Sequence, residues 1–530
     1  MNRYYIKNYY TLGTLIDFSG FFNVSYNDFD CDIELPLNNN GIDLKIFLDN
    51  SLPFDGYTIS IKKEVIIKAF NKRALNYAIN LLKQLISNNT LPYSFIEDHP
   101  NFKYRGIIEG FYGIPWSHEN RLDVIRFLDK YQMNMYVYAP KDDLYHRELW
   151  REFYPEKELN QLLSLNKLAS EKEIEFCYAI SPGKDFVFTN ENDYLALFNK
   201  IDFLFNHGIT MFSLLLDDID YNLKEADEKI FTSPGKAHAH LSNRLYEHLL
   251  TLTDEPYLVI CPTEYSTIDD SLYHQDLRSD LNKNIIVYFT GINVCANAIT
   301  NQDIKMISKV YGHDIAIWDN YPVNDYIPQR LYLSPIYNRG NELNTQVVQY
   351  VCNPMNQWES SKFALISLAR YLWNSSKYDP DLALEEGLDL YPDIKESLSV
   401  FIRANYPNIS TYGENLAFKD QIKNHNFKEI IKFYQELIDA IENLKNYNYP
   451  LIKEISPWFK RAEVEYNIVC KYLSNTLTKE DILNLKNDSH TYGIEIVDYI
   501  IKESNLLTES EFTNYIFKVR GYGWWNSFEK

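Results

Sequence analysis

From Arg105 onward the sequence repeats one unit, in which a short apolar run is followed by a longer stretch with helical periodicity. Alternation of this kind is typical of successive β-α units around a parallel sheet. Eight apolar runs fall within about 270 residues, which is the length of a closed eight-stranded barrel. They are residues 106–109, 134–139, 174–180, 211–216, 257–261, 285–289, 315–318 and 347–352. The repeat therefore predicts an α/β fold with a (β/α)8 TIM barrel.

The regions on either side of this repeat have other patterns. Strand-like runs at 42–48, 56–61 and 64–70 precede a stretch, 72–87, with apolar residues at helical spacing, which predicts a small α+β domain. Segment 92–100 has two prolines and few periodic apolar residues, so it predicts a linker. Amphipathic stretches at 382–388, 394–402, 427–441 and 458–473 predict a C-terminal helical bundle. The predicted domains are 1–100, 101–378 and 379–530.

The charge balance limits the kinds of partner that the chain can bind. Its 530 residues include 52 Lys and Arg against 73 Asp and Glu, a net charge of −21, without a block of basic residues. This argues against a nucleic-acid partner and against an anionic membrane. No apolar run approaches the ~18 residues of a membrane span, and residues 1–10 lack the apolar core of a signal peptide. We expect a cytoplasmic protein, although a secreted protein with its signal removed gives the same pattern.

Residue types that bind metals are scattered through the sequence. The cysteines form no C-x-x-C pair or zinc-like spacing, so we expect buried thiols and neither a disulfide framework nor a structural metal. They are Cys31, Cys177, Cys261, Cys295, Cys352 and Cys470. His238-Ala-His240 is similar to the H-x-H of metal-dependent hydrolases, but it follows a Ser-Pro-Gly turn at the start of a predicted helix and not a strand. A metal site there is disfavoured, and no metal or cofactor is predicted.

The most informative strand is Phe-Ser-Leu-Leu-Leu-Asp-Asp, residues 212–218, which ends in Asp217 and Asp218. Neighbouring strand residues point to opposite faces, so both carboxylates can face one mouth only where the strand leaves its ladder. Parallel barrels carry their active sites at that end. The plain alternative is that one aspartate caps the next helix and the other is solvated.

Five other predicted strands also run into polar clusters at their carboxyl ends, which would converge on the same mouth. These clusters are residues 105–113, 138–143, 261–265, 318–320 with Asp325, and 353–358. The set, in this order, resembles glycoside hydrolase family 84, the β-N-acetylglucosaminidases that include O-GlcNAcase and bacterial enzymes long labelled hyaluronidases. The resemblance is close from about residue 103 to residue 373. It extends to the small α+β domain that precedes the barrel in bacterial members and is loose in the C-terminal part.

The resemblance implies roles for particular residues. Asp217 would hold the acetamido group of the substrate, and Asp218 would act as general acid and then as base. Lys141 and the backbone of Gly106 would contact the sugar or its acetyl group, and Tyr265 would close against the acetamido side. The remaining implied positions are Trp318 in the aromatic wall, and Asn320, Asp325 and Asn353 at the acetamido group and the 4- and 6-hydroxyls.

The chemistry of two adjacent aspartates supports the same interpretation. A retaining glycosidase with its own nucleophile places two carboxyl groups about 5 to 5.5 Å apart on opposite sides of the scissile bond, which neighbouring residues fit poorly. They fit better where the N-acetyl oxygen of the substrate is the nucleophile, because one aspartate can then orient the amide while the other protonates the leaving oxygen. We expect the proximity of a like charge to raise the pKa of the protonating aspartate, which the resemblance identifies as Asp218, and to keep it protonated.

A second acidic pair, Asp142-Asp143, also follows a predicted strand. Its neighbour Lys141 would keep a nearby carboxylate charged, so we expect this pair to support the structure. The predicted function is that of a retaining exo-β-N-acetylglucosaminidase that removes terminal β-GlcNAc, including O-GlcNAc on Ser and Thr of proteins, through an oxazoline. The alternatives are a hyaluronan-degrading glycosidase, which the charge of −21 disfavours, and a catalytically silent carbohydrate-binding protein. The natural aglycone and the oligomeric state stay open.

Overall fold

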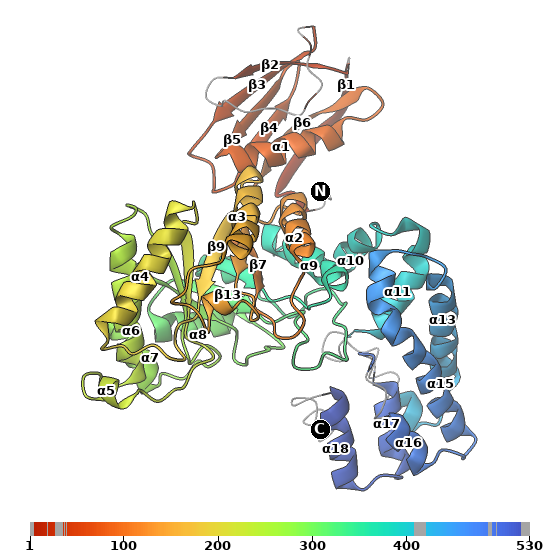
Figure 1. The fold of residues 1–530 in the computed structure, drawn as a ribbon. Coiled ribbons are helices and arrows are strands. Elements are labelled where there is room, and N and C mark those ends of the chain that lie inside the picture. Colours follow the sequence, from red (N-terminus) through yellow and green to blue (C-terminus); the bar gives the residue numbers. More distant parts are fainter. Residues whose placement is uncertain are drawn as a thin grey trace.

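The computed structural model shows three parts: a sheet at the N-terminal end, a central barrel, and a group of helices beside the barrel (Figure 1). It describes residues 5–18, 20–26, 35, 38, 40–406, 420–485, 490–493 and 495–520. The predicted fold class is confirmed, because the central strands close into a parallel barrel in the order β10-β11-β12-β13-β14-β7-β8-β9.

The N-terminal part is a six-stranded sheet in the order β1-β6-β4-β5-β3-β2, with one helix packed against it (Figure 1). Alternating burial along the central strands places residues such as Ile59 and Ile67 in a core with Leu75 and Leu82 of that helix. Asn71 caps the helix by accepting a hydrogen bond from the Ala74 N–H. The elements are β1 (Asn8–Asp17), β2 (Phe22–Tyr26), β3 (Ile42–Leu48), β4 (Tyr57–Ile61), β5 (Val65–Ala69), α1 (Lys72–Leu85) and β6 (Thr90–Asp98).

The prediction of a linker at 92–100 is wrong, because β6 occupies most of that segment and lies between β1 and β4 in the sheet. Two polar residues, Ser94 and Asp98, take buried positions in this strand and hide its alternation in the sequence. Pro92 is tolerated because it pairs with Leu15 beside a bulge in β1, at a point that β4 does not reach.

A buried ionic network joins this sheet to the barrel. Asp55 is fully buried, and it accepts hydrogen bonds from Arg105 Nη1 at 2.9 Å and from Asn134 Nδ2 at 3.1 Å. Arg105 is the second residue of the first barrel strand, and Asn134 directly precedes the second barrel strand. The N-terminal part therefore covers the amino ends of the barrel strands and leaves the carboxyl ends, where the predicted site lies, uncovered by this sheet.

The barrel confirms all eight predicted strands, to within two residues at either end. Apolar side chains such as Val137 and Leu215 fill its interior, and a larger cluster that includes Phe212 and Leu245 lies between the strands and the surrounding helices. The strands are β7 (Tyr104–Glu109), β8 (Met135–Tyr138), β9 (Glu175–Ile180), β10 (Met211–Leu215), β11 (Tyr257–Cys261), β12 (Ile286–Phe289), β13 (Ile315–Asp319) and β14 (Val347–Cys352). The helices are α2 (His118–Lys130), α3 (Glu156–Glu171), α4 (Glu191–Asn206), α5 (Glu225–Glu228), α6 (Pro234–Leu249), α7 (Leu272–Asp280), α8 (Asn301–Tyr311) and α9 (Trp358–Trp373).

The C-terminal part is helical, as predicted, and its helices stack along one side of the barrel (Figure 1). It packs on the barrel through Glu454, whose carboxylate accepts hydrogen bonds from the first turn of α9, and through Trp458, whose Nε1 donates to the Gln329 carbonyl at 2.7 Å. The longer helices are α10 (Pro380–Leu388), α11 (Lys395–Ala404), α13 (Lys428–Leu444), α14 (Pro450–Ile455), α15 (Phe459–Leu473), α16 (Lys479–Leu485), α17 (Ile496–Ser504) and α18 (Glu509–Arg520).

Two predictions from composition can be compared with the described residues. None of the described helices has both the length and the apolar character that crossing a bilayer requires. The cysteines in the described part of the chain are free thiols; Cys177, Cys261 and Cys352 are buried, Cys295 is half-buried and Cys470 is exposed. Cys31 lies outside the described residues.

Candidate active site

The two aspartates that follow β10 lie at the carboxyl-terminal mouth of the barrel. The strand ends at Leu215, and Leu216 remains tied to the next strand because its N–H donates to the Cys261 carbonyl at 2.9 Å. Asp217 and Asp218 then leave the ladder, which frees both side chains to turn toward the mouth. Asp217 lies deep, with 9% of its side chain exposed, whereas Asp218 lies on the open side with 36% exposed.

Lys141 connects the two carboxylates. It follows β8, its side chain is 7% exposed, and its Nζ lies 3.4 Å from Asp217 Oδ2 and 3.1 Å from Asp218 Oδ2. Burial alone would lower the pKa of this ammonium group, but the two carboxylates outweigh burial and raise it. Lys141 therefore stays charged and shields the aspartates from each other.

The expectation that the pKa of Asp218 is raised is wrong for this structure. Burial pushes the pKa of Asp218 upward, but the charge of Lys141 and a hydrogen bond from the Tyr112 hydroxyl outweigh burial and lower it. In the sequence, Lys141 stands next to Asp142, and its long side chain gave no sign of reaching across to β10. The resting form of Asp218 is therefore a carboxylate.

Asp217 has one oxygen with a vacant hydrogen-bonding position. Its Oδ1 is buried and accepts no hydrogen bond from any of the residues that the structure describes. A buried acceptor without a donor is costly, and such groups deserve a functional explanation. Tyr265, four residues after the end of β11, is half-buried close by, and burial, Cys261 and then Asp217 raise the pKa of its phenol. This part of the mouth fits a small group that carries an N–H donor.

A fixed network of amides lies across the mouth. Asn353 Nδ2 donates to Asn320 Oδ1 at 3.0 Å, and Asn353 Oδ1 accepts from the Gly110 N–H at 3.2 Å. Asn320 Nδ2 in turn donates to the Val294 carbonyl at 2.7 Å. Because each amide is held at both ends, its orientation is set before any ligand arrives, as binding sites for hydroxyl groups require.

Trp318 and Asp325 complete this side of the mouth. The Trp318 ring lies 5.8 Å from Lys141 Nζ and is almost fully buried. Asp325 Oδ2 accepts a hydrogen bond from the Tyr112 N–H at 2.8 Å, which ties the loop after β13 to the loop after β7. The structure thus brings together Lys141, Asp217, Asp218, Tyr265, Trp318, Asn320, Asp325 and Asn353.

Gly106 does not join this group. It lies inside β7, three residues before the strand ends, and a Cβ there would stand 1.8 Å from the Met135 carbonyl oxygen. The glycine that lies among the site residues is Gly110, just beyond the strand end. Its N–H donates to Asn353 Oδ1, and a Cβ at this position would lie 2.5 Å from the Trp318 ring. The cluster 105–113 contains several glycines, and only the position of the strand end distinguishes them.

Sequence reasoning also missed Tyr112 and Arg147. The Tyr112 hydroxyl donates to Asp218 Oδ2, and Arg147 Nη2 lies 3.5 Å from that hydroxyl. Tyr112 belongs to the Gly-Phe-Tyr-Gly run that was assigned to the mouth without a role. Arg147 follows β8 by nine residues and carried no usable signal.

The competing acidic and histidine pairs have structural partners. Asp143 accepts hydrogen bonds from the hydroxyls of Tyr138 at 2.9 Å and Tyr154 at 2.6 Å, which fits the supporting role predicted for it. His238 is buried in α6, where its Nδ1 lies 2.9 Å from the Tyr273 hydroxyl. Within the described ranges, no group of three or more His, Cys, Asp and Glu side chains is placed to hold a metal ion.

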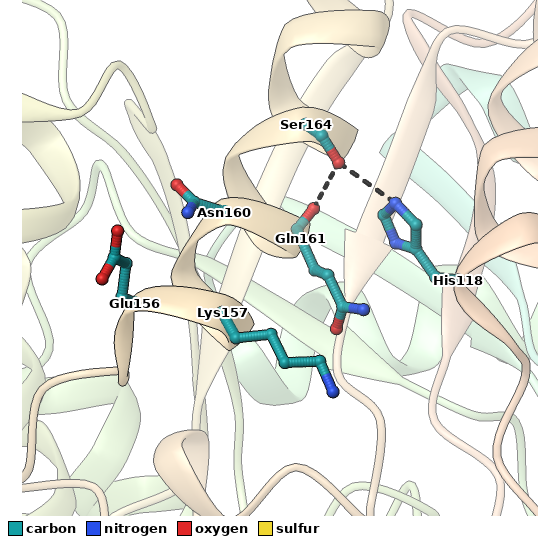
Figure 2. Close-up of a pocket in the computed structure, with 6 residues that line it drawn as sticks. All are labelled: His118, Glu156, Lys157, Asn160, Gln161 and Ser164. Atoms are coloured by element: carbon teal, nitrogen blue, oxygen red, sulfur yellow. Dashed lines mark hydrogen bonds between the residues drawn. The ribbon is translucent and has the colours of Figure 1, made fainter.

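A separate open hollow of about 610 Å³ lies on the outside of the barrel, between the first residue of α2 and the first half of α3 (Figure 2). Its lining is polar, and His118 Nε2 lies 3.2 Å from the Ser164 hydroxyl there. The lining residues are His118, Glu156, Lys157, Asn160, Gln161 and Ser164. None of the predicted site residues is among them, so this hollow is separate from the strand-end clusters.

Comparison with known proteins gives one consistent result. A family model described as β-N-acetylglucosaminidase matches residues 105–403, which include the barrel and its mouth. Protein O-GlcNAcase of Rattus norvegicus is 37% identical over 292 residues, which are 54% of this chain and 31% of that protein, and the Mus musculus protein gives the same values. The chain thus spans about a third of the length of these relatives.

Two solved structures are similar over most of the chain. One, titled "Structure of CpGH84B", has a TM-score of 0.82 and 25% sequence identity, and the match covers 94% of this chain and 98% of that one. The other is an O-GlcNAc hydrolase mutant of Thermobaculum terrenum, with a TM-score of 0.68 and 29% identity over 80% of this chain and 98% of that one. Both matches extend beyond the barrel into the flanking parts.

Proposed function

Because the chain belongs to glycoside hydrolase family 84, the β-N-acetylglucosaminidases, we propose that it is a retaining exo-β-N-acetylglucosaminidase. In this proposal the substrate's own N-acetyl oxygen is the nucleophile and an oxazoline is the intermediate. The observation that carries the proposal is the buried Oδ1 of Asp217, which has no hydrogen-bond donor among the described residues and lies beside Asp218. An acetamido N–H would supply that donor.

The reaction balances with these two residues alone. The acetyl oxygen attacks C1 while the bond from C1 to the leaving oxygen breaks, and Asp218 gives its proton to the leaving oxygen. Asp217 accepts the acetamido N–H and stabilises the positive charge that develops on the amide. Water then attacks C1 while the bond from C1 to the acetyl oxygen breaks, Asp218 takes a proton from that water, and the two inversions at C1 retain the configuration.

Lys141 sets the condition for the first step. It holds Asp218 as a carboxylate in the free enzyme, so Asp218 has to take up a proton before or while the substrate binds. A sugar hydroxyl near Lys141 would draw the ammonium group away from Asp218 and allow this uptake. The carboxylate form is already suited to the second step, in which Asp218 acts as base.

We propose GlcNAc at the end of a glycan or on Ser and Thr of proteins as the substrate, since the similar proteins are named for O-GlcNAc. The amide network of Asn320 and Asn353 would bind the far hydroxyls of the sugar, and Trp318 would contact its ring. The net charge of −21 disfavours hyaluronan, which is a polyanion.

A substrate panel tests this proposal. Purified enzyme is incubated with an aryl β-GlcNAc, an alkyl β-GlcNAc, a GlcNAc-serine peptide, an aryl β-glucoside and hyaluronan oligosaccharides. We expect turnover of the first three with release of β-GlcNAc, and none of the glucoside, which lacks the acetamido group. Turnover of the glucoside, initial release of the α-anomer, or inactivity toward every GlcNAc substrate would overturn the proposal.

Lys141→Met tests the electrostatic arrangement of the mouth. The charge of Lys141 lowers the pKa of Asp218, so its removal raises that pKa and keeps Asp218 protonated to higher pH. We expect kcat/KM for the alkyl glycoside to fall with rising pH in both enzymes, with the falling limb at higher pH in the variant, because kcat/KM reports the free enzyme. If the falling limb lies at the same pH in Lys141→Met as in the wild type, a group other than Asp218 causes the fall.

A further inference from the structure

Arg147 is a buried cation beside the candidate acid. Its residue is 6% exposed, and its Nε is buried without a hydrogen-bond acceptor among the described residues. The acidic residue next to it in the sequence, Glu148, is 44% exposed, and its Oε1 lies 3.4 Å from Lys184 Nζ, so Arg147 acts on it only through its charge, which contributes to lowering the pKa of Glu148. Among the described residues, no carboxylate lies within ion-pair distance of this guanidinium; burial of such a cation costs stability, and such costs are kept where they serve function.

Arg147 is connected to Asp218 through the side chain of Tyr112, which contacts both residues. Its guanidinium lies 5.6 Å from the centre of the Tyr112 ring, and its Nη2 lies 3.5 Å from the Tyr112 hydroxyl. The Lys141 ammonium lies 5.2 Å from the centre of the same ring. Tyr112, which is otherwise 46% exposed, is therefore held by two cations while its hydroxyl donates to Asp218.

We infer that Arg147 is a positioning residue for the acid, acting through Tyr112 to hold the Asp218 carboxyl group in the orientation that protonates the leaving oxygen. Arg147 does not reach the carboxylate itself within hydrogen-bond distance. It fixes the Tyr112 ring by a cation–π contact, which is stronger in a desolvated site. The inference rests on the proposed role of Asp218 and adds a residue to that role.

Arg147 also affects the ionisation of Asp218, in the same direction as Lys141. The positive charge of Arg147 contributes to lowering the pKa of Asp218, after burial, Lys141 and the Tyr112 hydrogen bond. The titratable and charged groups that face Asp218 from the surrounding loops are Tyr112, Lys141, Arg147, Asp217, Cys261, Tyr265 and Asp325. A substitution of Arg147 leaves the other groups in place, so the effect of the Arg147 charge on the pH profile can be measured separately from the effects of those groups.

The test is a double-mutant cycle with Arg147→Met and Tyr112→Phe, measured with an alkyl and a nitrophenyl β-GlcNAc. When the carboxyl group of the acid is no longer held in its productive orientation, the kcat of the enzyme falls by about 10- to 100-fold. We expect that loss for each single variant with the alkyl glycoside, a much smaller loss with the nitrophenyl glycoside, and little change in KM. The falling limb of kcat/KM moves to higher pH in both. In the double variant the losses do not add, because both residues act through one contact.

Two further variants make the test specific. Arg147→Lys retains the positive charge, so the falling limb of its kcat/KM profile should lie close to the pH at which it lies in the wild type. Arg151→Met removes an arginine four residues further along, which pairs with Asp185 and Asp193 and has no contact with Tyr112 among the described residues, so this variant should behave as wild type. If Arg147→Met does not fold, Tyr112→Phe and Arg147→Lys carry the comparison.

The outcomes separate the two claims. Wild-type enzyme that is inactive toward both glycosides refutes the proposed function. Active wild-type enzyme with equal losses on both glycosides, additive losses in the double variant, or an unmoved limb refutes the role of Arg147 alone.

Discussion

Asp218→Asn will lower kcat/KM for an alkyl β-N-acetylglucosaminide by about 10²- to 10⁴-fold, the range that general acid catalysis contributes. An alkoxide is a poor leaving group and needs the proton, whereas a nitrophenolate leaves without one. The same variant should therefore turn over a nitrophenyl glycoside with a much smaller loss. The measurement is the ratio of the two losses, with KM compared to detect changes in binding alone.

Asp142→Asn is a matched control for this prediction. Asp142 also follows a barrel strand and is exposed. Its Oδ1 lies 3.8 Å from Arg121 Nη2, and it forms no ion pair with Lys141 of the candidate site among the described residues. We expect it to affect both substrates equally and weakly. Equal large losses on both substrates in Asp218→Asn would show that Asp218 is not the acid.

Much of the fold follows from the sequence because the barrel strands are buried on both sides. Such strands are nearly continuous apolar runs, and those of 211–216 and 347–352, which each contain one polar residue, Ser213 and Gln349, are visible without any structure. The N-terminal sheet is harder to predict from the sequence, since β6 buries the polar residues Ser94 and Asp98. Buried polar residues hide the alternation of apolar and polar positions that identifies a strand. The Asp98 carboxylate is satisfied by Tyr57 and Trp373, which no local pattern predicts.

The candidate site divides in the same way. The clusters that contain Asp217, Asn320 and Asn353 were placed at the mouth because the end of a parallel strand fixes where a side chain can lie, and the family resemblance then implied these residues within them. Lys141 was predicted as a contact, but its effect on Asp218 was not, because a long side chain spans the distance between two strands. Arg147 lies beyond a strand end and reaches the site through a tyrosine, so no spacing rule indicates it.

Asp217→Ala will lower kcat for every GlcNAc substrate by about 10²- to 10³-fold, because it removes a charge aimed at the atoms where charge develops. The loss should not depend on the leaving group, in contrast to that of Asp218→Asn, since Asp217 assists the acetamido group and not the departing oxygen. Its vacant Oδ1 faces no other donor among the described residues, so removal leaves no broken protein contact at that atom. A loss that follows leaving-group acidity would mean that the roles of the two residues are reversed.

The most direct test of the account is the rate for substrates whose N-acetyl group carries zero, one, two and three fluorines. Fluorine withdraws electron density from the acetyl oxygen, so a mechanism in which that oxygen attacks C1 predicts a stepwise fall in both kcat and kcat/KM. The fall should be flatter in Asp217→Ala, which no longer stabilises the amide. A rate that is indifferent to fluorination, or a glycosyl ester trapped on an aspartate, would show that the protein supplies the nucleophile and would contradict the account.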